Sequence, residues 1–174
     1  MHAPGSEAKK RLLRLRLNGR WREDAVRDDW GKFFYLRDVR SGAVWSSGFQ
    51  PVLREPQDYE VIFTESKADF RRRDAGIFTH TEIIVSTEDD AELRRVFVTN
   101  ESARTREIEI TSYAEIVLNE QAADEAHPAF SNMFVETEYV AAQQTLLARR
   151  RKRSAEDAEG KVWSQFELGK AAKN

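Results

Sequence analysis

The sequence predicts an all-β protein, built as an antiparallel sandwich or barrel. From residue 32 onward, apolar and polar residues alternate with a period of two in most segments. The alternating segments are short and are separated by turn residues. Only residues 119–130 look irregular or briefly helical. Eight or nine such strands, each with one solvent-exposed face and one buried face, are typical of an antiparallel sandwich.

The first predicted element is a hairpin. Alternation in KFFYLRDV, residues 32–39, places Phe33 and Tyr35 on one side of a strand. A Ser-Gly pair suits a tight turn, and AVWS returns as a second strand that carries Trp45. Because Trp45 lies just past a turn, we expect its ring to be exposed, whereas Tyr35 has apolar neighbours on its side and could belong to the core.

The further predicted strands lie at 58–65, 77–86, 92–100, 105–118, 133–140, 145–152 and 161–168, with 105–118 the longest.

Composition limits the class of protein. A chain of 174 residues is expected to form one domain, and 40% hydrophobic residues are enough for a core. The formal net charge of −2 argues against a nucleic-acid-binding protein, which needs a basic face. The sequence has no cysteine, no apolar run long enough to span a bilayer and no secretory signal. We therefore expect a cytoplasmic protein.

The organisation along the chain suggests two parts. Residues 1–20 are basic and have no clear pattern, so we expect a disordered or non-native lead-in. Residues 21–174 are expected to form the β-sandwich.

No motif for chemistry is complete in the sequence. A nucleophile elbow and a glycine-rich phosphate loop are absent, and the three histidines are far apart. We interpret His80 as a structural histidine on a half-buried strand, whereas His127 precedes a proline in a loop and could touch a ligand. We interpret the arginine runs at 71–73 and 149–153 as solvated strand ends that discourage edge pairing. The sequence therefore predicts no metal site and no cofactor.

Aromatic residues are the remaining signal. Large rings can stack on the C–H side of sugars, but they are also the usual core residues of a sandwich, and both interpretations are open. Seven aromatic residues fall within 29 positions: Trp21, Trp30, Phe33, Phe34, Tyr35, Trp45 and Phe49.

These segments resemble a known family. The stretches that carry the resemblance are WREDAVRDDWGKFFYLRDVRSGAVWSSGFQP, YEVIFTESKADFRRRDAGI and TREIEITSYAEIVL followed by HPAF. They are similar to the N-terminal β-domain of the inverting glycoside phosphorylases once classed as glycosyltransferase family thirty-six. The similarity covers roughly residues 21–166 and points most closely to the phosphorylase-like region of cyclic β-1,2-glucan synthases.

The resemblance implies a β-supersandwich related to galactose mutarotase. In the family this domain precedes a helical barrel that carries the catalytic acid and the phosphate site, and nothing in this sequence resembles that barrel. Asn18-Gly19-Arg20 meets Trp21 directly where the family has a further hairpin, and the similarity stops early at the C-terminus. We therefore expect an incomplete sandwich with unpaired edges, and hence a homo-oligomer.

The resemblance implies a non-catalytic, carbohydrate-associated domain of a β-glucan synthase or glycoside phosphorylase. Its expected partners are a weakly bound β-glucan or oligosaccharide and the barrel of a parent enzyme associated with the inner membrane. The alternative is a self-associating interaction module that binds no sugar. A mutarotase-like enzyme is disfavoured, because His80 with Glu82 is the one local acid–base candidate. The candidate sugar-contacting residues are Trp45, Tyr35, Trp30, Phe49, Arg37, Gln50 and His127.

Overall fold

A computed structural model describes residues 31–89, 91–119, 121–151 and 163–167 of the chain. The described residues divide into two compact units, the first ending at Glu115 and the second beginning at Ile116. None of the helices among these residues has the length and hydropathy that a membrane-spanning helix requires.

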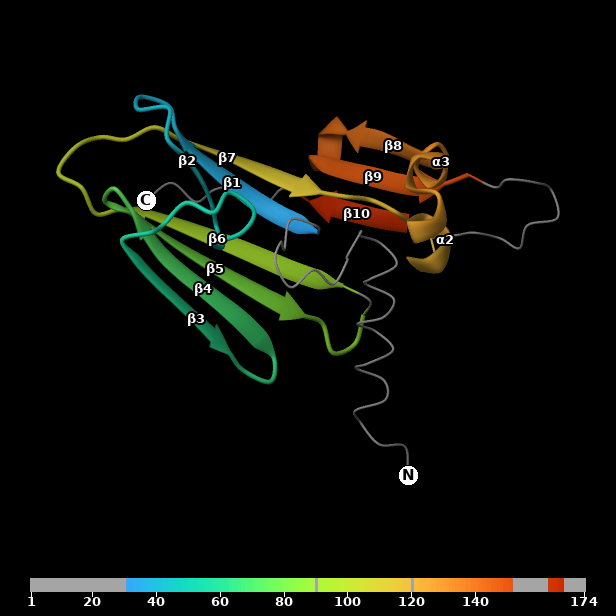
Figure 1. The fold of residues 1–174 in the computed structure, drawn as a ribbon, viewed down its shortest axis with the longest axis horizontal. Coiled ribbons are helices and arrows are strands. Elements are labelled where there is room, and N and C mark those ends of the chain that lie inside the picture. Colours follow the sequence, from blue (N-terminus) through green and yellow to red (C-terminus); the bar gives the residue numbers. More distant parts are fainter. Residues whose placement is uncertain (1–30, 90, 120, 152–162, 168–174) are drawn as a thin grey trace. The chain divides into compact units, whose positions relative to one another are not determined.

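The first unit consists of two antiparallel sheets (Figure 1). The smaller sheet has the strand order β2-β1-β7, and the larger has the order β3-β4-β5-β6, so that its strands follow the chain as a meander. The strands are β1 (Lys32–Asp38), β2 (Val44–Ser46), β3 (Asp58–Phe63), β4 (Lys67–Asp74), β5 (Ile77–Val85), β6 (Glu92–Asn100) and β7 (Ile108–Ala114).

The core of this unit lies between the two sheets. Leu36 of β1 and Trp45 of β2 pack with Ile77 of β5, and each of the three is at most 1% exposed. Val98 of β6 and Ile108 of β7 pack against this cluster. One face of each sheet is thus buried against the other, which confirms the predicted antiparallel all-β fold.

Strand β4 corrects the prediction for the arginine run at 71–73. These residues do not form a solvated strand end, because β4 pairs with β3 on one side and β5 on the other. Arg72 points into the unit and is 1% exposed. Its two neighbours point the other way and pair with carboxylates on β3, Arg71 with Glu60 and Arg73 with Asp58.

The strand expected at 105–118 is shorter than predicted. Strand β7 covers seven residues, whereas β5 and β6 cover nine each. The two isoleucines of this strand differ in burial: Ile108 packs against the core, whereas Ile110 is 49% exposed.

The second unit holds a small three-stranded antiparallel sheet in the order β10-β9-β8. Two short helices precede it, as the irregular segment at 119–130 suggested. The Arg150 guanidinium donates to the carbonyls of Val117 and Ser131, which ties β9 to the segments on either side of the first helix. The elements are α2 (Gln121–Ala126), α3 (Pro128–Asn132), β8 (Val135–Val140), η1 (Ala141–Gln143), β9 (Thr145–Arg150) and β10 (Trp163–Glu167).

Candidate functional site

Trp45 does not have the exposed ring that its position after a turn suggested. It pairs in register with Leu36, and paired residues on neighbouring strands point to the same face of a sheet. Leu36 faces the larger sheet, so the indole of Trp45 is buried with it and is only 1% exposed. The ring is part of the core of the first unit.

Tyr35, which could have been core, lies instead on the opposite face of the smaller sheet. Its ring centroid is 6.4 Å from that of Phe33 and 6.2 Å from that of Tyr113, the latter in an edge-on arrangement. The rings of Phe33 and Tyr113 stack at 6.4 Å, because these two residues are register partners. Tyr113 is 42% exposed.

An ion pair continues this surface along the two strands. Arg37 and Glu109 are register partners, and their side chains meet at 3.1 Å between Nη1 and Oε2. Both side chains are more than half exposed. Burial, with a smaller effect of the nearby Glu115 carboxylate, raises the pKa of Tyr35 above its ordinary value. We call this set of side chains the aromatic surface: Phe33, Tyr35, Arg37, Glu109 and Tyr113.

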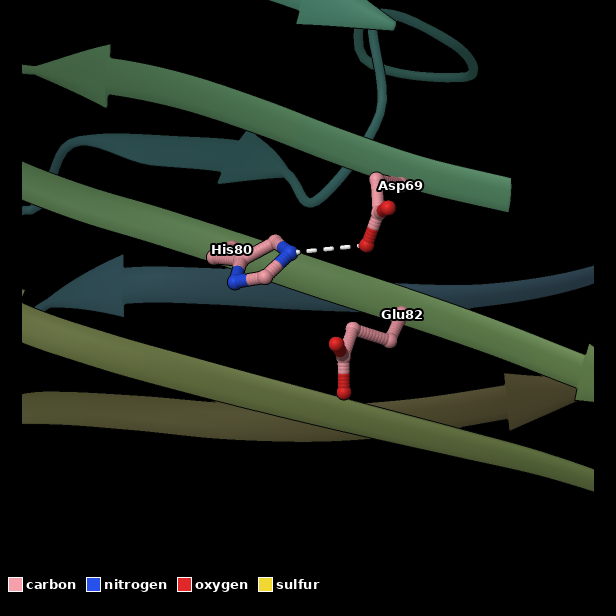
Figure 2. Close-up of side chains that lie close together, drawn as sticks. All are labelled: Asp69, His80 and Glu82. Carbon is pink, nitrogen blue, oxygen red and sulfur yellow. Dashed lines mark hydrogen bonds and ion pairs between the residues drawn. The ribbon is translucent and has the colours of Figure 1, made fainter. Parts of the chain in front are cut away.

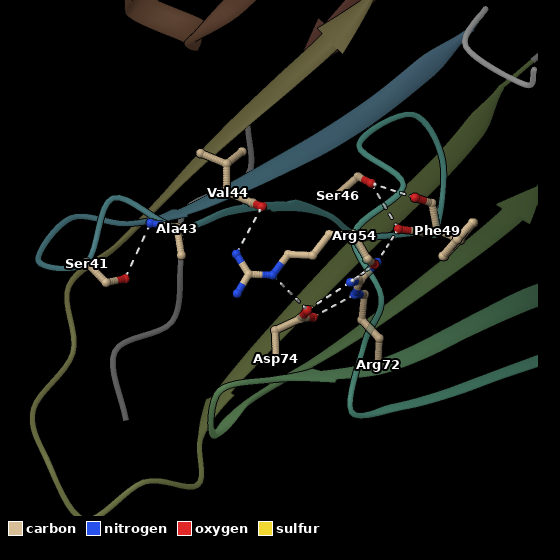
Figure 3. A network of polar contacts seen from close by, with 9 residues as sticks. Ser41, Ala43, Val44, Ser46, Phe49, Arg54, Arg72 and Asp74 are labelled. Atoms are coloured by element: carbon tan, nitrogen blue, oxygen red, sulfur yellow. Dashed lines mark hydrogen bonds and ion pairs between the residues drawn. The ribbon is translucent and has the colours of Figure 1, made fainter.

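The loop between β2 and β3, which carries two of the candidate sugar-contacting residues, is held by a buried arginine (Figure 3). The guanidinium of Arg72 binds both carboxylate oxygens of Asp74, at 2.6 and 2.8 Å. It also donates to the carbonyls of Gly48, near the start of the loop, and Arg54, in its second half. Because the arginine and the carboxylate are both buried, these contacts are shielded from water.

Further hydrogen bonds fix the start of this loop. The Ser46 hydroxyl donates to the carbonyls of Gly48 and Phe49, at 3.0 and 3.4 Å (Figure 3). The backbone N–H of Phe49 donates to the Tyr59 hydroxyl. Phe49 and Gln50 are both half-buried, and the Gln50–Pro51 peptide bond is cis. The loop is thus an ordered part of the first unit.

The predicted sugar-contacting residues do not all lie together. Tyr35 and Arg37 share the aromatic surface, whereas Trp45 is in the core. His127 is exposed and precedes α3 in the second unit. Trp30 lies outside the described residues. Contact of this set with a sugar stays a prediction.

A second group of polar side chains lies on the face of the larger sheet that points away from the core. It consists of Lys67 and Asp69 on β4, His80 and Glu82 on β5, and Arg95 on β6 (Figure 2 shows the middle three). His80 Nε2 is 2.9 Å from Asp69 Oδ1. The Lys67 ammonium lies 2.9 Å from Asp69 and 3.4 Å from Glu82, so that it stands between two carboxylates.

The charges in this group reinforce one another. The hydrogen bond from Lys67, followed by that from His80, lowers the pKa of Asp69 below its ordinary value. The same contact with Asp69 raises the pKa of Lys67. The imidazole of His80 stacks on the Phe97 ring at 5.6 Å, which fixes its plane. His80 thus lies on a half-buried strand, as the sequence predicted, and the structure adds its contact with Asp69.

From the sequence, His80 with Glu82 was named as a local acid–base candidate, but Asp69 was missed. Asp69 and Glu82 are direct register partners on β4 and β5. Their proximity was therefore hidden as long as β4 was not predicted as a strand. Every second residue of 67–74, beginning with Lys67, is charged, and this period of two is the signal that could have revealed the strand.

The fold and these sites define an antiparallel sandwich domain that bears aromatic and charged outer faces. Residues 7–173 match the glycosyl hydrolase 94 supersandwich domain, and the chain belongs to this family. This confirms the resemblance to the glycoside phosphorylases.

Individual relatives agree with the family. The chain is 41% identical over 144 residues to the cyclic beta-(1,2)-glucan synthase NdvB of Rhizobium meliloti (strain 1021), which covers 82% of the chain and 5% of the synthase. It is 30% identical over 130 residues to solabiose phosphorylase of Paenibacillus borealis, covering 75% of the chain and 16% of that enzyme. It is 31% identical over 122 residues to N,N'-diacetylchitobiose phosphorylase of Vibrio furnissii, and this match covers 69% of the chain and 15% of that enzyme. The chain thus spans less than a fifth of the length of each of these relatives.

Proposed function

We propose that this domain supports carbohydrate binding in a β-glucan synthase or glycoside phosphorylase, through its aromatic surface. The observation that carries the proposal is the group of three rings, Phe33, Tyr35 and Tyr113, beside the exposed ion pair of Arg37 with Glu109. The relatives named above act on or make glycosides by their printed names, which supports a sugar as the ligand.

The chemistry of the aromatic surface suits a pyranose. A sugar ring has an apolar C–H face that stacks on aromatic side chains, and a rim of hydroxyls that needs charged or polar partners. Tyr35 on β1 and Tyr113 on β7 could stack on the C–H face of the sugar. On the same two strands, Arg37 could donate a hydrogen bond to a sugar hydroxyl and Glu109 could accept one. The surface is open, so that it buries little of a ligand, and we expect affinity of roughly 1 mM.

The alternative function is a self-associating module without sugar binding. One observation favours it: Phe63, at the end of β3, is 75% exposed, and β3 is an outer strand of the larger sheet as described. An exposed apolar side chain on an outer strand is a common site of pairing with a second copy. Homo-oligomerisation of the chain stays a prediction.

Titration of the ¹⁵N-labelled chain with a β-1,2-gluco-oligosaccharide, followed by NMR, separates these two functions. Sugar binding predicts saturating shifts of the amides around Tyr35 on β1 and Tyr113 on β7. Tyr35→Ala should remove the shifts, because the central ring of the surface is lost. Tyr139→Ala is the matched control, since Tyr139 is 56% exposed but lies on β8 in the second unit.

An absence of shifts at tens of millimolar sugar in the folded wild-type chain would reject the sugar-binding proposal. Resonances that change on dilution without sugar would then favour the self-associating module. Equal losses in Tyr35→Ala and Tyr139→Ala would also reject the aromatic surface as the binding site.

A further inference from the structure

The three side chains in Figure 2 combine the donor atoms that transition metals prefer. One ligand atom from each of Asp69, His80 and Glu82 lies within 4.8 Å of the others. An imidazole nitrogen and two carboxylate oxygens are a common partial ligand set for Zn²⁺, with the remaining positions open to water. The hard cations Ca²⁺ and Mg²⁺ would need more oxygen ligands than these side chains supply.

The backbone holds these donors in place. Asp69 and Glu82 face each other as register partners in the middle of the larger sheet, and His80 is two residues before Glu82 on the same face. Two paired strands therefore position all three side chains, and no loop is involved. Sites on regular elements keep their geometry better than sites on loops.

The three possible ligands, Asp69, His80 and Glu82, differ in how far their side chains are buried. The side chain of Asp69 is 4% exposed, that of Glu82 is 13% exposed and that of His80 is 21% exposed. The carboxylates are thus largely removed from water, while the imidazole borders solvent and leaves an approach for an ion. Partly desolvated carboxylates attract a cation more strongly than solvated ones.

A positively charged side chain, that of Lys67, already contacts the two carboxylates. The Lys67 ammonium lies within 3.4 Å of a carboxylate oxygen of both acidic residues. The Lys67 side chain is 35% exposed and sits on a flexible four-carbon stem, so it can turn into solvent. Arg95 contacts Glu82 Oε2 at 2.7 Å and is more than half exposed, so it can also withdraw.

We propose that Asp69, His80 and Glu82 form a binding site for a divalent transition-metal cation such as Zn²⁺, in which the metal displaces the Lys67 ammonium. The metal takes His80 Nε2 and one oxygen from each carboxylate. The imidazole binds in its neutral form, with its proton on Nδ1, so that the present hydrogen bond to Asp69 is replaced by two bonds to the metal.

Isothermal titration calorimetry of the full chain with ZnCl₂ tests this site. The chain has two other histidines, and His2→Ala/His127→Ala removes both of them as adventitious ligands. In that background we expect one Zn²⁺ per chain. His80→Ala should weaken binding by at least about tenfold, because one of three protein ligands is lost.

Two further variants in the same background test how the charges of Lys67 and Glu82 affect Zn²⁺ binding. Lys67→Met keeps the apolar stem but removes the competing ammonium, so it should tighten Zn²⁺ binding by about tenfold. Glu82→Gln keeps the shape of the side chain and should weaken binding as His80→Ala does. It also serves as the second ligand variant if His80→Ala fails to fold by circular dichroism.

A direct readout is the ¹⁵N spectrum of the His80 imidazole, in which Zn²⁺ should move the Nε2 resonance. The proposal is overturned if the His2→Ala/His127→Ala chain shows no saturable binding up to about 1 mM Zn²⁺. It is also overturned if the ligand variants bind as the background does, or if Lys67→Met binds no more tightly.

Discussion

Three consecutive arginines on β4 show how position decides the role of a side chain. Arg71 and Arg73 lie on the outer face and pair with exposed carboxylates of β3. Arg72 points inward, where its side chain is fully buried with Asp74 and with two loop carbonyls. Exposed ion pairs add little stability, whereas a buried, fully hydrogen-bonded pair becomes costly once one partner is removed.

We predict that Arg72→Met lowers the free energy of unfolding by about 3–5 kcal/mol. The substitution leaves the buried Asp74 carboxylate without its two-pronged partner, and it removes the Arg72 donor from the part-buried carbonyls of Gly48 and Arg54. Arg71→Met, its neighbour on the outer face, should cost less than about 1 kcal/mol. Urea denaturation followed by circular dichroism measures both. Similar midpoints for the two variants would contradict the structural role of Arg72.

The aromatic residues show how much the sequence could predict at this scale. Alternation correctly placed Phe33 and Tyr35 on one side of β1, because side-chain direction follows from the period of two. It could not say which side faces the core, since both sides carry large apolar residues. Trp45, whose ring was expected to be exposed, is therefore buried, whereas Tyr35, which could have belonged to the core, lies on the outer face.

At the scale of elements, the turn between β4 and β5 is a two-residue hairpin that joins the paired residues Asp74 and Ile77. Both of its residues have positive φ, 50° for Ala75 and 80° for Gly76. Such a turn follows the twist of the strands and favours Asn-Gly. Glycine meets this demand at the second position, whereas alanine is strained in the left-handed region at the first.

We predict that Ala75→Asn raises the free energy of unfolding by about 0.5–1 kcal/mol, because asparagine tolerates the left-handed region better than alanine does. Gly76→Ala should lower the free energy of unfolding by about 1 kcal/mol or more. A Cβ at this position would lie 3.1 Å from the Cβ of Ser102, in addition to the strain of its φ. Thermal denaturation compares the two variants with the wild type. A lower melting temperature for Ala75→Asn would contradict the turn geometry.

The element that sequence reasoning missed is β4, and the cause is physical. Its outer face carries charged residues that pair with neighbouring strands, and its inner face carries the buried ion pair of Arg72 with Asp74. Neither face shows the apolar stripe by which a strand is recognised. Because the pairing of β4 with β5 brings Asp69 to His80 and Glu82, the polar cluster could not be predicted without this strand.

At the scale of the whole molecule, sequence alone was sufficient for the fold class and the family, since both depend on patterns spread over the chain. The sites depend on which strands pair and in which register, and neither could be assigned for the larger sheet while β4 was missing from the predicted strands. Charged side chains in the first unit lie at interfaces between strands, where their ionisation is coupled to folding. The stability of this unit should therefore depend on pH.

Two buried carboxylates set the direction of this dependence. The backbone N–H of Ser41 holds the pKa of Asp38 below its ordinary value, and Lys67, followed by His80, does the same for Asp69. In the unfolded chain both groups return to a pKa of about 3.9. The unfolded state therefore takes up protons first as the pH falls. The stabilisation is fully present above about pH 4 and is lost as the pH falls through the lower pKa values of the folded chain.

We predict that the urea midpoint of the wild-type chain falls steeply between about pH 4 and pH 2, and that Asp69→Asn shows a smaller fall over this range. The asparagine cannot take up a proton, so the contribution of Asp69 to the pH dependence is removed. Glu60→Gln is the control, because Glu60 is exposed and pairs with Arg71 at the surface, so it should keep the steep fall of the wild type. Circular dichroism in urea at a series of pH values measures all three chains. A wild-type midpoint that stays constant or rises on acidification would show that these carboxylates are not stabilised by their partners in the folded chain.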